Sequence, residues 1–163
     1  MTSKADFTEE EWTRIRRAPF VAGLAISIAD PGGPIEVAKE TMASIRSASV
    51  APSDEQLVQG VARDIQTLIQ QKQSPIGDFK PTGGAMAGQQ VLDELRAVNE
   101  IVAAKATPDE AAAFRGWLMT AARAAAAAAK EGGFMGFGGE QVSRGEQVML
   151  DQLSSTLGTP VAD

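Results

Sequence analysis

The residues of this sequence that could do chemistry are its carboxylates. Asp30, Glu36, Glu131 and Glu146 stand near two Gly-Gly pairs, where turns could bring acidic side chains together. Carboxylate oxygens suit hard divalent cations, so Asp30 and Glu36 are the candidate ligands for Ca²⁺ or Mg²⁺. A simpler interpretation is that these acids cap helices, because negative charge is favoured at helix N-termini in any case.

Other kinds of active site are excluded by the residue types that are missing. The chain has no histidine, no cysteine and no tyrosine. Catalytic triads based on histidine, thiol nucleophiles, zinc–thiolate sites and the Glu-x-x-His di-iron pattern therefore cannot be built. The acidic ligand loop of an EF-hand is also absent. The sequence predicts a protein that is not an enzyme and has no cofactor beyond a possible Ca²⁺ or Mg²⁺.

A second acidic group lies within one predicted helix. Asp93, Glu94 and Glu100 are interrupted by Arg96. Because residues three and four apart are neighbours on a helix surface, this spacing predicts a solvated ladder of ion pairs rather than a site.

The net charge of −6 argues against nucleic acid as a partner. A negative surface repels phosphate backbones unless basic residues cluster. The one basic cluster is Arg14, Arg16 and Arg17, which we interpret as a solvated helix face.

A glycine-rich segment, residues 132–139, could form a binding surface. It lacks the Gly-Lys-Ser/Thr of a phosphate-binding loop. It carries Phe134, Met135 and Phe137, which could fold back into the core or stand out as anchors for a protein partner. Burying a phenylalanine stabilises the fold by roughly 1.5–3 kcal/mol, which favours fold-back. These three residues are nevertheless the candidate partner-binding residues.

Helix start signals show which predicted helix carries each of these candidate residues. Capping boxes are predicted at Thr8/Glu11, Ser53/Gln56, Thr107/Glu110 and Ser143/Glu146, and Gly158 is placed as a helix C-cap. Apolar residues recur at three- and four-residue steps between them, and no alternating strand pattern is present. We expect six helices, at about 8–29, 34–48, 53–73, 84–106, 108–130 and 143–157.

The sequence thus predicts an all-α, single-domain bundle over residues 1–158 and a flexible tail at 159–163. The alanine run 124–129 should form a tightly packed central helix, since alanine is the best helix former. No signal peptide and no membrane-spanning stretch is visible, so we expect a cytoplasmic location.

Two helix–Gly-Gly–helix units raise the alternative of an old duplication. In the first, Ala29-Asp30-Pro31-Gly32-Gly33 precedes a helix with an early Glu36. This turn resembles that of the TerB-like (tellurite-resistance) all-helical domains. The second unit has Lys130-Glu131-Gly132 and an expanded loop instead. The resemblance implies a compact bundle, cation binding by acidic residues and a role in stress response or in a membrane-associated complex.

Two functions follow as hypotheses. The first is a non-enzymatic helical interaction or scaffold protein of bacterial type, which acts through a protein partner or self-association. The second is a TerB-like stress-response protein that binds a divalent cation through carboxylates.

Overall fold

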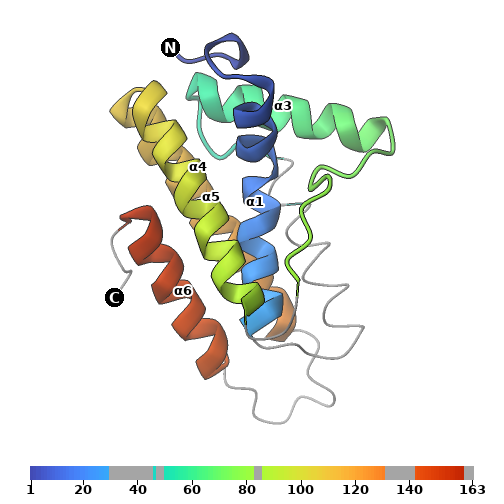
Figure 1. Cartoon of the computed structure of the whole chain (residues 1–163), viewed down its shortest axis with the longest axis vertical. Coiled ribbons are helices and arrows are strands. Elements are labelled where there is room, and N and C mark those ends of the chain that lie inside the picture. The colour runs from blue at the N-terminus through green and yellow to red at the C-terminus, as the bar shows by residue number, and fades with distance from the viewer. Residues whose placement is uncertain (30–45, 47–49, 83–85, 131–141, 160–163) are drawn as a thin grey trace.

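The fold is all-α, as predicted (Figure 1). The computed structural model describes residues 1–29, 46, 50–82, 86–130 and 142–159, and no strand occurs among them. After a short 3-10 turn at Lys4–Asp6, the helices are α1 (Glu9–Ala29), α3 (Gln56–Gln70), α4 (Ala87–Lys105), α5 (Pro108–Lys130) and α6 (Arg144–Leu157). Each begins and ends within three residues of a predicted helix. The sixth predicted helix, 34–48, lies outside the described residues except for Arg46, which is helical.

Three of the four predicted capping boxes are present. The box at α1 shows the pattern: the Thr8 backbone N–H donates to a Glu11 carboxylate oxygen at 2.8 Å, and the Glu11 N–H donates to the Thr8 hydroxyl at 3.1 Å. The boxes Thr107/Glu110 at α5 and Ser143/Glu146 at α6 have the same reciprocal bonds. Each box satisfies N–H groups that have no partner within the helix.

The prediction for α3 is wrong in detail. Ser53 accepts a hydrogen bond from the N–H of Glu55 at 3.1 Å, and the helix begins only at Gln56. The Ser53 side chain therefore stabilises a turn before the helix and does not form a capping box with Gln56.

Helix α1 lies at the centre of the bundle and contacts α3, α4, α5 and α6. In Figure 1, α4, α5 and α6 run along α1, whereas α3 lies across one end. Small side chains allow α1 and α5 to pack closely: both contribute fully or almost fully buried alanines, which are Ala18, Ala22 and Ala25 on α1 and Ala121, Ala122, Ala125 and Ala126 on α5. The prediction for the alanine run 124–129 is therefore correct in part: Ala125 and Ala126 are buried, whereas Ala127 is exposed.

Two pairs of aromatic side chains are part of this core. Phe114 and Trp117 of α5 pack edge to face with ring centroids 6.1 Å apart. Near the N-terminus, Trp12 of α1 packs against Phe7 at 5.7 Å. Rings at these distances stabilise the fold through buried area and favourable ring geometry.

Candidate functional site

The residues predicted to form sites fall mostly outside the described part of the chain. Asp30, Glu36, Phe134, Met135 and Phe137 all lie there, as do both Gly-Gly turns.

Glu146 is described, and its carboxylate caps α6 through the Ser143 N–H at 2.9 Å. Within the described ranges, no three acidic residues are grouped as a cation site would require.

The basic cluster of α1 differs from its prediction as a solvated face. Arg14 and Arg17 both reach the carboxylate of Glu94 on α4, with shortest N–O distances of 2.8 and 2.6 Å. Glu94 is buried. The guanidinium of Arg17 also lies over the Phe79 ring, at 4.9 Å from its centroid. These two arginines are therefore tied into the bundle.

The third arginine of the cluster is also paired. Arg16 donates to the carboxylate of Asp64 on α3 at 3.0 Å, and the Trp12 indole N–H donates to the same oxygen at 3.0 Å. Burial would raise the pKa of Asp64, but the hydrogen bonds from Arg16 and Trp12 and the charge of Lys4 lower it overall. One charged face of α1 thus holds α3 and α4 in place.

The ion-pair ladder predicted on α4 is correct only in part. Asp93 pairs with Arg96 at 2.7 Å on the exposed face. Glu94 points the other way, into the bundle, where burial raises its pKa but the hydrogen bonds from Arg14 and Arg17 lower it by more. Glu94 therefore stays ionised, and its role is to hold α1 against α4.

A cleft of about 530 Å³ opens beside this ion pair. It is lined by Glu9, Glu10, Thr13, Arg14, Arg17 and Glu94. Its two arginines already bind Glu94, and its two other glutamates would repel an anion. The cleft is best explained as the open side of a structural ion pair.

A second cleft, between α5 and the end of α6, has a different character. It has a volume of about 300 Å³ and is lined by Ala112, Arg115, Gly116, Met119, Arg123, Gly158 and Thr159. We call it the α5–α6 groove. Its lining holds two arginines and no acidic residue, in a chain whose net charge is −6.

Arg115 is held in a fixed orientation at this groove. Its Nε donates to the side-chain oxygen of Asn99 on α4 at 2.7 Å. The amide nitrogen of Asn99 in turn makes a long contact of 3.5 Å with the carbonyl of Thr156 on α6. Because Nε is occupied, the two terminal nitrogens of Arg115 form the free edge of the guanidinium.

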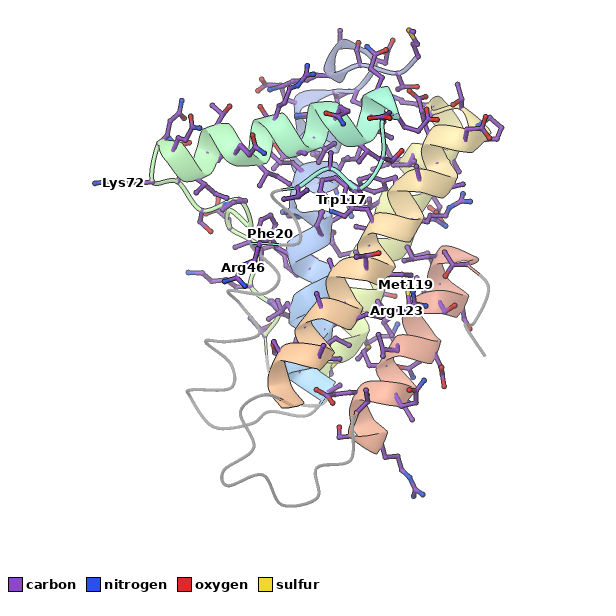
Figure 2. All side chains as sticks on the ribbon, turned by 180° about the vertical axis from the view of Figure 1, so that it is seen from behind. Phe20, Arg46, Lys72, Trp117, Met119 and Arg123 are labelled. Carbon is purple, nitrogen blue, oxygen red and sulfur yellow. The ribbon has the colours of Figure 1, made fainter. Side chains whose placement is uncertain are left out.

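Arg123 lies two turns further along α5, beyond Met119 (Figure 2). It is exposed and makes no hydrogen bond or ion pair with the described residues. Met119 is buried and forms the apolar floor of the groove between the two arginines.

The carbonyls at the end of α6 are already used. Those of Ser154 and Ser155 accept hydrogen bonds from the N–H groups of Thr159 and Gly158, where Gly158 takes a left-handed conformation with φ of 66°. The predicted C-cap is confirmed. The guanidinium groups of Arg115 and Arg123 are therefore not needed to cap these carbonyls and can donate hydrogen bonds to an external anion.

Sequence reasoning missed this groove. The one local signal is the spacing of Arg115, Met119 and Arg123, which places them on one face of a helix. The contribution of α6 carries no such signal, because it depends on how two helices pack.

Comparisons with protein-family models, with curated proteins and with solved structures found no match to this chain. In the described part, no helix has both the length and the apolar character needed to cross a membrane.

Proposed function

We propose that this protein is a helical interaction module whose α5–α6 groove binds an acidic segment of a protein partner. The observation that carries the proposal is a pair of arginines whose outer edges have no partner among the described residues, on either side of a buried methionine. Arginine binds carboxylates with two parallel hydrogen bonds, which gives both affinity and orientation.

The chemistry of the groove favours a carboxylate-bearing peptide. Ligand sites typically combine an apolar lining with a few well-placed polar groups. Met119 and Ala112 supply the apolar part, and Arg115 and Arg123 supply the charge. The remainder of an acidic chain would repel an acidic partner, so this local positive charge also determines where such a partner can land.

The test uses the whole chain labelled with ¹⁵N and a defined probe, the acetylated and amidated peptide Glu-Ala-Val-Ala-Glu. We expect its addition at low salt to shift the backbone N–H resonances of Gly116 and Gly158 selectively. Arg115→Ala/Arg123→Ala should weaken binding at least tenfold, since each lost charged hydrogen bond is worth roughly 1.5–3 kcal/mol.

The matched control is Arg63→Ala/Arg144→Ala, which removes the same charge from two exposed positions outside the groove. It should bind the probe within about twofold of the parent. Equal weakening by both double variants would show non-specific charge attraction and overturn the proposal, as would the absence of any shift at millimolar peptide.

Sedimentation of the parent and of Arg115→Ala/Arg123→Ala tests whether the groove binds a second copy of this chain instead. A monomeric parent supports the proposal that the ligand belongs to a different protein. A dimer that only the groove variant dissociates would assign the groove to self-association and overturn the proposal of an acidic partner segment.

A further inference from the structure

The groove contains a glycine that the fold itself does not require. Gly116 lies in the interior of α5, a helix otherwise rich in alanine. A Cβ built on Gly116 would meet nothing within 4 Å. Glycine is less favourable than alanine in a helix interior, so at this position alanine would be the expected residue.

Four other described glycines differ from Gly116 in backbone conformation or in surroundings. Gly77 and Gly158 have positive φ values of 61° and 66°, which side chains rarely adopt. An added Cβ at Gly60 would lie 3.6 Å from Trp12, and at Gly88 it would lie 3.5 Å from Met149, both in ordinary van der Waals contact with a neighbouring side chain. Gly116 has neither a left-handed backbone nor a neighbour within 4 Å of an added Cβ.

We infer that Gly116 is where the main chain of the bound segment lies against α5, in an extended conformation between Arg115 and Arg123. This inference rests on the proposed function and goes further, because it states the shape of the ligand. The missing side chain exposes the α5 backbone at the point where the groove is lined by Ala112 and Met119.

The exposed backbone at Gly116 favours an extended segment. In a helical segment about 10–12 Å wide, side chains surround the main chain and keep it away from α5. An extended main chain can come close to a glycine, because no Cβ stands between the two backbones. The groove at this point has a volume of about 300 Å³.

The spacing of the arginines then sets the spacing of the carboxylates. Arg115 and Arg123 are eight residues apart, which is about 12 Å along a helix axis. An extended chain rises about 3.3 Å per residue, so four residues cover this distance. Two acidic side chains at positions i and i+4 of the segment match the two guanidinium groups.

The experiment measures stability and probe binding for Gly116→Ala and Gly116→Leu in the full chain. Both should fold, because nothing in the described structure occupies the space. We expect the melting temperature of Gly116→Ala to rise by about 1–4 °C, from its better helix propensity. We expect the Kd for Glu-Ala-Val-Ala-Glu to increase about threefold with alanine and at least tenfold with leucine.

The control substitution is Ala104→Leu, which enlarges an exposed position on α4 outside the groove. It should leave the Kd unchanged. A control peptide, Ala-Glu-Val-Glu-Ala, has the same composition with its glutamates two residues apart, and it should bind about fivefold more weakly. Stability that rises while binding weakens is an outcome that mere damage to the fold cannot produce.

Two results separate this inference from the proposed function. If Arg115→Ala/Arg123→Ala abolishes binding but Gly116→Leu leaves the Kd unchanged, the groove is a binding site and the inferred contact at Gly116 is wrong. If both peptides bind equally, the extended arrangement is wrong.

Discussion

Thr2 and Glu110 are 108 residues apart in the sequence, yet they share two hydrogen bonds in the interior of the protein. The backbone N–H and the hydroxyl of Thr2 donate to the two carboxylate oxygens of Glu110 at 2.8 and 2.5 Å. Both residues are buried, and the Thr107 N–H donates to the same carboxylate at 3.1 Å. The cap of α5 thus also ties the N-terminal segment to the bundle.

Glu110→Gln should make the protein less stable near neutral pH. Burial alone would raise the pKa of Glu110, but the hydrogen bonds from Thr2 and Thr107 outweigh it and lower the pKa to about 2. A carboxyl whose pKa is lower in the folded state stabilises that state above its unfolded pKa. This contribution, roughly 3 kcal/mol, is lost as the pH falls from about 4.5 towards 2.

Urea unfolding of the parent and of Glu110→Gln between pH 2 and pH 7 measures this. The difference in unfolding free energy should be largest above pH 5 and should shrink in acid. Glu100→Gln, at an exposed position of α4, is the control and should stay within about 0.5 kcal/mol. A pH-independent difference would contradict the role given to the ionised Glu110.

In Arg14→Ala/Arg17→Ala, the contribution of Glu94 to the free energy of unfolding should change sign, so that this part of the stability increases as the pH falls. With both guanidinium groups gone, Glu94 is left as a buried carboxylate without cations. Breaking such a pair costs roughly 3–5 kcal/mol at pH 7. Burial then raises the pKa of Glu94 above its unfolded value, so lowering the pH from 7 to 5 protonates it and recovers stability.

The measurement is again the free energy of unfolding, in the double variant and in the triple variant that adds Glu94→Gln. The triple variant should be the more stable of the two at pH 7, because it no longer buries an uncompensated charge. If the two are equally stable at pH 7, Glu94 is better hydrated than its burial indicates.

The contrast between these two sites shows how far the sequence can be interpreted. The Thr107/Glu110 box was predictable because a capping box joins residues three apart. The second function of the same Glu110, its bonds to Thr2, was not. In the same way, the sequence predicts Arg14 as part of a solvated helix face and Glu94 as part of an ion-pair ladder within its own helix. Their actual pairing joins α1 to α4 across 80 residues.

The groove illustrates the same limit. The sequence alone places two arginines and a glycine on one alanine-rich helix, namely Arg115, Gly116 and Arg123. What makes them a site is the end of α6 opposite them and Asn99 of α4 behind Arg115. Helix packing decides those contacts, and a single sequence does not encode them in any local pattern.

Ser143→Ala should cost more stability than Ser53→Ala, although both serines precede a helix and have a polar partner three residues later. The Ser143 hydroxyl accepts from the Glu146 N–H at 3.2 Å within a complete capping box. Its removal should cost about 1 kcal/mol. The Ser53 hydroxyl accepts only the Glu55 N–H, in a turn that precedes α3, so removing it should cost less than half as much stability. Denaturant unfolding measures both, and equal costs would contradict the difference between the two helix starts.

Asn99→Ala should weaken probe binding while leaving every charge in the groove. The substitution removes the acceptor that fixes Arg115 Nε, so the guanidinium must be ordered when the peptide binds. We expect the Kd for Glu-Ala-Val-Ala-Glu to rise about three- to tenfold and the stability to fall by about 1 kcal/mol.

Salt dependence distinguishes this positioning role from loss of charge. The slope of log Kd against log salt should be unchanged in Asn99→Ala, since both arginines still meet the glutamates. In Arg115→Ala the slope should become smaller, because one ionic contact is gone. An Asn99→Ala variant that binds the peptide as tightly as the parent would show that Arg115 needs no support from α4. In that case the groove would recognise its ligand by charge alone, and the fixed orientation of Arg115 would contribute nothing to specificity.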